Sequence, residues 1–225
     1  MTSTTTSTKT QSFSGAADFS RILAAFAWAV LLSMVAYFVL REVPRYFVWS
    51  EASYGAYYWP RKTVVFPHIL MAISALVIGP FQFLPQIRNG YPKVHRILRR
   101  IYVVSALLGS ASGIVMAVIS SRGLVNDTGL FGLGFAGLLT TSMAYIAIRK
   151  RNFIQHKQWM VRSYVVIFGF VTIRSITTVM LHYGFNNPDD RFGVATWACW
   201  AVPLLFAELV IQGKQVFAGG TRSAA

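Results

Sequence analysis

Charged residues, cysteine and acidic residues are all scarce in this chain, and each shortage excludes a class of protein. Charged residues make up only 12% of the 225 positions, about half the fraction that is usual in a soluble domain, which argues against a soluble fold. The single cysteine, Cys199, excludes an internal disulfide, a CxxC redox pair and haem attachment through CxxCH. With seven acidic residues, the chain also offers no pair of catalytic carboxylates.

Sequence motifs of the common enzyme classes are missing as well. The chain has no HxxxH, HxxE or CxxC pair for a metal ion and no nucleophile triad. The glycine-rich segment GLFGLGFAG, at residues 129–137, lies inside an apolar run, where glycine serves helix packing and not phosphate binding. The sequence therefore leaves open whether the protein is an enzyme.

Apolar residues are abundant, and their arrangement predicts an integral membrane protein. The chain is 55% hydrophobic and has a mean hydropathy of +0.51. Its apolar runs are long enough to cross a bilayer as helices. We expect an all-α bundle with a disordered polar tail at 1–20, one six-span domain at 21–213 and a polar tail at 214–225. The predicted spans are residues 22–40, 64–87, 101–121, 130–148, 156–182 and 194–212.

The net charge of +14 comes from short basic clusters between the apolar runs and not from one continuous basic face. This pattern is typical of membrane topology signals and of contact with anionic phospholipid, so no nucleic-acid partner is expected. Fourteen of the 21 Lys and Arg residues lie in residues 1–21, in the tail at 214–225 and in the connectors around 88–100 and 149–162. The bias predicts a bacterial inner membrane protein with both termini in the cytoplasm.

The two basic connectors have similar sequences. His95 is followed by Arg100 and Tyr-Val-Val, and His156 is followed by Arg162 and Tyr-Val-Val. Spans two and three would then form one helical hairpin and spans four and five another, as in a parallel internal repeat. The alternative is that a basic helix start is used twice without duplication. If the repeat is real, His95 and His156 can face each other near the cytoplasmic surface.

The second span carries a stripe of small and polar residues, and we expect it to face the inside of the bundle because lipid would leave polar groups unsatisfied. The step of three and four places these residues on one face: His68, Ala72, Ala75, Gly79, Gln82 and Gln86. Pro80 predicts a bend near Gly79. In the third span, the GSASG segment with Gly109 and Gly113 predicts a close helix contact.

Arg174 lies inside the apolar run of the fifth span, and a charge at membrane depth marks a site by default. It shares a helix face with Thr178 and His182. Its partner is expected to be an anion or, in the structural alternative, backbone carbonyls or Gln82. Glu208 of the sixth span lies at a different depth from Arg174, which favours a different pairing for it. The candidate partners of Glu208 are Arg100, Arg162, His95 and His156.

The most specific functional hypothesis that the histidines suggest is a b-type haem site. Two neutral imidazoles on facing helices can ligate iron, and an arginine such as Arg174 can pair with a propionate. His68 and His182 would form an outer pair, and His95 and His156 an inner pair. The structural alternative is that the rim histidines contact lipid phosphate and the outer ones hydrogen-bond within helix ends.

Three segments resemble an uncharacterised family of bacterial multispanning membrane proteins, the domain of unknown function 2306. They are PHILMAISALVIGPFQF, HRILRRIYV and HKQWMVRSYVVIFGFVTIR. The resemblance implies a multispanning membrane fold but no activity, and His182 lies outside its pattern. The leading hypothesis is a haem- or quinone-binding redox membrane protein. The alternatives are a small-ligand transporter that uses Arg174 and Glu208, and a non-catalytic subunit of a membrane complex.

Overall fold

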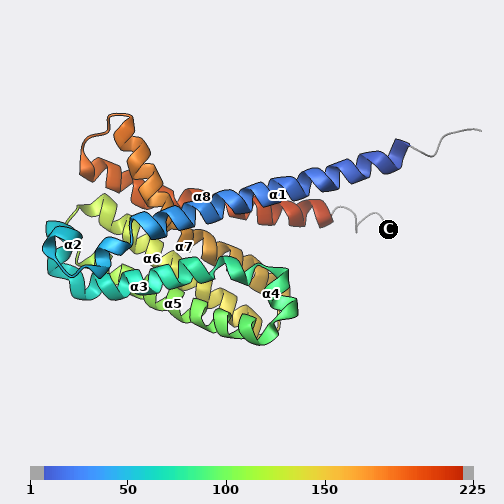
Figure 1. Ribbon diagram of the computed structural model, residues 1–225, viewed down its shortest axis with the longest axis horizontal. Coiled ribbons are helices and arrows are strands. Elements are labelled where there is room, and N and C mark those ends of the chain that lie inside the picture. The colour runs from blue at the N-terminus through green and yellow to red at the C-terminus, as the bar shows by residue number, and fades with distance from the viewer. Residues whose placement is uncertain (1–7, 220–225) are drawn as a thin grey trace, which may run out of the picture. The chain divides into compact units, whose positions relative to one another are not determined.

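The computed structural model of the protein describes residues 8–219, and this part of the chain is almost entirely helical, without a strand (Figure 1). The prediction of an all-α fold is confirmed. The helices are α1 (Thr8–Arg41), α2 (Glu51–Tyr58), α3 (Lys62–Ile78), α4 (Pro85–Gly90), α5 (Pro92–Val118), α6 (Leu124–Arg149), α7 (Phe153–His182) and α8 (Pro188–Gly219), with short 3-10 turns η1 (Pro44–Phe47), η2 (Trp59–Arg61) and η3 (Pro80–Gln82).

Six helical segments are long and apolar enough to cross a membrane, in agreement with the six predicted spans. Most of them are longer than the apolar runs that predicted them: α7 has 30 residues, for example, and α5 has 27. Polar residues at the ends of a helix can stay helical once they leave the hydrocarbon layer. The ends of a helix therefore do not mark the edges of the hydrocarbon layer.

The chain divides into two compact units, residues 1–44 and 45–225. The first contains α1, which begins at Thr8, inside the segment 1–20 that we expected to be a disordered tail. The second contains α2 to α8, and α8 continues to Gly219, past the expected end of the domain at residue 213. We had expected a single domain over 21–213.

Four helices of the second unit form a ring that surrounds the candidate site. Helix α3 packs against α5, α5 against α6, α6 against α7, and α7 against α3. Helices α5 and α7 therefore lie across the ring from each other. Helix α8 packs on the outside of the ring, against α6 and α7.

Glycine allows two of these helix contacts to be close, as the sequence predicted. The position of a Cβ on Gly109 would lie 3.4 Å from the backbone nitrogen of Ala72, so α5 and α3 approach nearly backbone to backbone. A Cβ on Gly134 would lie 2.7 Å from Cγ1 of Ile114 and 2.9 Å from the carbonyl oxygen of Ser110. These contacts are the small-residue packing that membrane helices use in place of hydrophobic collapse.

The predicted break near Gly79 is confirmed, since α3 ends at Ile78 and η3 follows. In a continuous helix the Leu76 carbonyl would accept from the backbone N–H of residue 80, but Pro80 has none. The hydroxyl of Tyr164 on α7 donates to this carbonyl instead, at 3.2 Å. A Cβ on Gly79 would collide with the Tyr164 ring. The break after α3 and the absence of a side chain at Gly79 therefore make room for the Tyr164 ring.

Candidate functional site

His95 and His156 lie at the same end of the four-helix ring, which we call the histidine end. His95 lies in the first turn of α5 and His156 in the first turn of α7, and these two helices face each other across the ring. The two imidazoles lie within electrostatic range of each other, and both lie within range of Arg99. Arg88 is a further cation near His95.

The hydrogen bond of His156 determines which ring nitrogen is available. Its Nδ1 lies 2.9 Å from the Ala144 carbonyl oxygen on α6, and a carbonyl can only accept, so Nδ1 carries the proton. In the neutral ring Nε2 then keeps its lone pair, which is the arrangement of a metal-ligating histidine. His95 differs, because its Nδ1 is buried without a hydrogen-bond partner. A buried imidazole nitrogen without a partner is costly and marks a place where a further group can bind.

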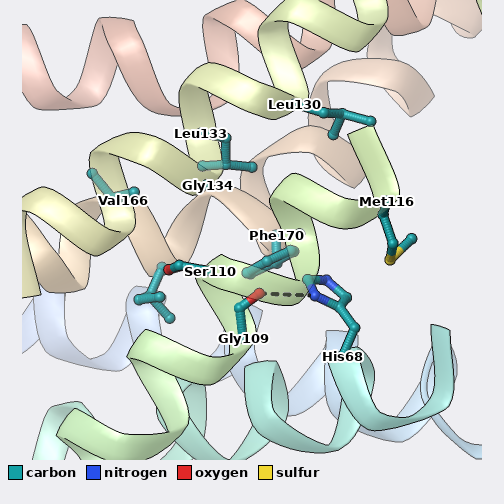
Figure 2. A pocket seen from close by; sticks show the side chains of 11 residues that line it. His68, Gly109, Ser110, Met116, Leu130, Leu133, Gly134, Val166 and Phe170 are labelled. Carbon is teal, nitrogen blue, oxygen red and sulfur yellow. Dashed lines mark hydrogen bonds between the residues drawn. The ribbon is translucent and has the colours of Figure 1, made fainter. Parts of the chain in front are cut away.

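His68 lines a separate small cavity together with residues of α5, α6 and α7 (Figure 2). Its Nδ1 donates to the Gly109 carbonyl at 3.0 Å and lies 3.1 Å from Ser112 Oγ, so its Nε2 is also the nitrogen with the lone pair. The phenyl ring of Phe170 packs edge-on against the imidazole of His68, with ring centroids 5.3 Å apart. The cavity has a volume of about 50 Å³, enough for a few water molecules but far below the several hundred Å³ of a typical cofactor pocket.

The expected outer pair of His68 and His182 is not assembled. His68 is buried, whereas His182 is exposed at the end of α7 and its ring contacts Tyr183. Thr178, also exposed, donates to the backbone oxygen of Arg174. Thr178 and His182 are thus exposed, unlike the buried His68.

Arg174 is half-buried and lies one turn beyond Phe170, the residue of α7 that packs against His68. Its charge interacts with Tyr58 of α2. This position is at the end of the ring where α2 lies, opposite the histidine end, and not at the middle of the span. Arg174 is therefore remote from His95 and His156.

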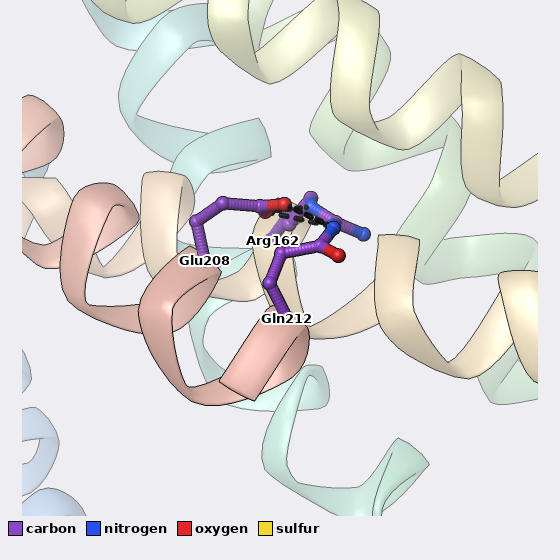
Figure 3. A network of polar contacts seen from close by, with 3 residues as sticks. All are labelled: Arg162, Glu208 and Gln212. Atoms are coloured by element: carbon purple, nitrogen blue, oxygen red, sulfur yellow. Dashed lines mark hydrogen bonds and ion pairs between the residues drawn. The ribbon is translucent and has the colours of Figure 1, made fainter. Parts of the chain in front are cut away.

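Glu208 pairs with Arg162, one of the four partners that the sequence allowed (Figure 3). Arg162 Nε donates to Oε2 at 2.7 Å and Nη2 to Oε1 at 3.0 Å, which is the two-point geometry of strong guanidinium–carboxylate pairs. Gln212 donates to Oε1 at 2.7 Å, and the Trp159 ring lies 4.6 Å from Arg162 Cζ. The spacing of four residues between Glu208 and Gln212 is the signal that could have indicated the amide.

Glu208 and Arg174 lie far apart along the bundle, as the sequence indicated. Arg162, the partner of Glu208, precedes Arg174 by twelve residues of the same helix, which is about 18 Å along the axis. The two charges therefore have different partners at different depths.

The polar stripe of the second span faces inward over most of its length. His68, Ala72, Ala75, Gly79 and Gln82 are buried, and only Gln86 is exposed. Gln82 is 8% exposed, and neither its amide nitrogen nor its amide oxygen has a partner. Since η3 packs against α5, Gln82 supplies an unsatisfied donor and acceptor on the side of the ring that carries His95.

A fully buried chain of hydroxyl groups links three helices, and the sequence did not predict it. Tyr102 on α5 and Thr141 on α6 each lie 2.8 Å from Ser163 Oγ on α7. All three residues have less than 2% of their surface exposed. These hydrogen bonds fix the rotation of the three helices. The hydroxyl residues carry no charge and have no regular spacing, so a sequence pattern does not reveal them.

These features define an integral membrane protein built on a helical bundle with a polar interior. The model of the family described as predicted membrane protein (DUF2306) matches residues 65–211. This range covers more than half of the chain, and the protein therefore belongs to that family. No curated protein and no solved structure matches it.

Proposed function

We propose that the protein binds one b-type haem at the histidine end and acts as a redox protein of the membrane. The observation that supports this most directly is the placement of His95 and His156 at the same end of two helices on opposite sides of the ring. Cofactor sites in helical bundles are built from side chains on facing helices. No other pair of histidines in the described part of the chain has this relationship.

The surrounding groups suit such a ligand. The Nδ1 bond of His156 to Ala144 leaves Nε2 for the metal, and the cations Arg99 and Arg88 suit propionate carboxylates. When bound between two imidazoles, haem supplies reversible one-electron transfer. The residues of the chain would orient the group and balance its charge. The small cavity at His68 is not needed for this function.

The same proposal includes an orientation in the bacterial inner membrane. The basic bias places the histidine end and both termini at the cytoplasmic surface. The exposed basic residues near this end, such as Arg96, Arg100 and Lys157, would contact anionic phospholipid headgroups there.

The absorption spectrum of purified protein from haem-supplied cells tests the function. A Soret band that shifts on addition of dithionite is expected. The substitutions His95→Ala and His156→Ala should each remove most of the bound haem, whereas the exposed His182→Ala serves as the matched control and should retain it. A colourless wild-type protein without iron refutes haem binding. If solvent extraction of that protein then yields a stoichiometric quinone, the redox ligand is a quinone instead.

A further inference from the structure

Two arginine side chains contact the same tyrosine side chain. This contact lies at the end of the four-helix ring opposite the histidine end. The Arg61 Cζ lies 4.6 Å and the Arg122 Cζ 4.1 Å from the centroid of Tyr57. Arg122 also stacks on Phe192, at 4.6 Å. Elements far apart in the sequence thus meet around two guanidinium groups: α2, η2, the loop before α6, and the start of α8.

The positions of these groups are fixed by hydrogen bonds to the backbone and to hydroxyl groups. Arg61 Nη1 donates to the Tyr57 carbonyl at 2.8 Å and Nε to the Ile119 carbonyl at 3.1 Å. The Tyr57 hydroxyl lies 2.8 Å from Ser120 Oγ. The loop that carries Arg122 is therefore held against α2 and η2, and Arg122 is presented by a constrained segment.

Several buried guanidinium nitrogens here have no acceptor. Nε of Arg122 and both Nε and Nη1 of Arg191 are buried and make no hydrogen bond. Arg191 immediately precedes Phe192, the ring on which Arg122 stacks. Buried polar groups are nearly always satisfied in folded proteins, and an unsatisfied charged donor is more costly than a neutral one.

The acidic residues nearby do not neutralise these cations. In the described part of the chain neither Arg122 nor Arg191 forms an ion pair. The Asp127 carboxylate accepts from Asn126, at 2.9 Å, and Asp190 accepts from Asn187, at 2.8 Å. Arg61 and Arg122 are held over the same Tyr57 ring, and positive charges held close together attract an anion.

We propose that Arg122 and Arg191, with Arg61 beside them, bind a phosphate or carboxylate group. A planar guanidinium offers paired N–H donors that match the oxygens of either group. The group comes from an anionic phospholipid of the adjacent leaflet or from a free anion. The site is independent of the haem proposal because it uses no residue of the histidine end.

The test measures thermal unfolding of the full chain by tryptophan fluorescence in a neutral detergent. Sodium phosphate and sodium acetate are titrated against sodium chloride at equal ionic strength. Phosphatidylglycerol and phosphatidylcholine are compared in nanodiscs by native mass spectrometry. The variants are Arg122→Gln and Arg191→Gln, and Lys150→Gln, an exposed basic residue at the histidine end, is the control. Arg122→Lys keeps the charge without the planar fork and shows whether loss of the charge alone prevents folding.

Saturable stabilisation by phosphate or acetate, weakened about tenfold or more in the two glutamine variants and unchanged in Lys150→Gln, supports a free-anion site. Selective retention of phosphatidylglycerol with the same variant pattern supports a lipid headgroup. The proposal is overturned if wild-type protein responds to no anion, or if Lys150→Gln weakens the response as much as Arg122→Gln does. Since no haem signal is measured, either result leaves the proposed redox function to its own test.

Discussion

The guanidinium of Arg162 and the carboxylate of Glu208 form a two-point ion pair that joins α7 to α8, with the shortest distance at 2.7 Å. The Arg162 side chain is only 9% exposed, whereas that of Glu208 is 39% exposed. Leaving Arg162 without its partner should therefore cost more stability than leaving Glu208 without its partner, because an unpaired charge is more costly when it is buried.

Removing Glu208 should destabilise the protein more than removing both charges. Glu208→Ala leaves Arg162 uncompensated, and we expect a loss of roughly 1–3 kcal/mol, below the value for a fully buried pair because solvent reaches the carboxylate. The double variant Arg162→Met with Glu208→Met should be closer to wild type. Thermal unfolding in detergent measures both. Equal losses in the two variants would contradict the asymmetry of burial.

Enlarging Gly134 should separate α5 from α6. Gly134→Ala places a methyl group against Ile114 and the Ser110 carbonyl, and we expect a loss of about 1–3 kcal/mol. Gly213→Ala in α8 is the matched control, because its added methyl group meets nothing within 4 Å and alanine favours the helix. The unfolding midpoint should fall for the first variant and stay or rise for the second.

Ser163→Ala should cost more than Tyr102→Phe, since it leaves two buried hydroxyls, those of Tyr102 and Thr141, without their shared partner. We expect about 1–3 kcal/mol for each hydroxyl left unsatisfied. Tyr145→Phe, at a residue that is 47% exposed, should change little. The measurement is again the unfolding midpoint, and the reverse order of the first two variants would show that the hydroxyls are satisfied in another way.

The haem content should be one per chain and should not depend on His68. The His68 ring faces a cavity of about 50 Å³, too small for a haem, and His182 is not beside it. We expect His68→Ala to keep the Soret band while lowering stability, because it removes the bond to Gly109. Iron and haem assays on the purified protein provide the stoichiometry, and a ratio near two would restore a second haem site.

The proposed orientation can be tested by labelling single cysteines in intact cells. A membrane-impermeant maleimide should react with Asn186→Cys, in the exposed turn before α8, and not with Lys150→Cys, in the turn between α6 and α7. The native thiol of Cys199 is 0% exposed and should stay unlabelled, so the background is low. Reaction at Lys150→Cys alone would place the termini outside.

The sequence was sufficient for features that depend on one helix or on the cost of a lone charge. Long apolar runs predicted six spans, Pro80 predicted the break, and the cost of an unpaired carboxylate in lipid required a basic partner for Glu208. Each of these rests on local chemistry that the bilayer makes strict. For these features the bilayer permits few other structures, so the sequence alone could predict them.

The sequence was less informative about which residues meet. Arg174 lies inside α7, as its apolar run indicated, but its charge interacts with Tyr58 of α2, a neighbour that no sequence pattern predicted. The Tyr102–Ser163–Thr141 chain depends on the rotation of three helices at once. Rotation is set by packing between helices, and a single sequence contains little information about it.

The contact between Tyr164 and the α3 break implies that two distant sequence positions are chemically interdependent. Replacing Pro80 with an ordinary residue would return an N–H to compete for the Leu76 carbonyl, and the displaced phenol would need a new acceptor. Relatives that lack this proline should therefore also lack the tyrosine hydroxyl, and a paired exchange at both positions should be tolerated better than either change alone.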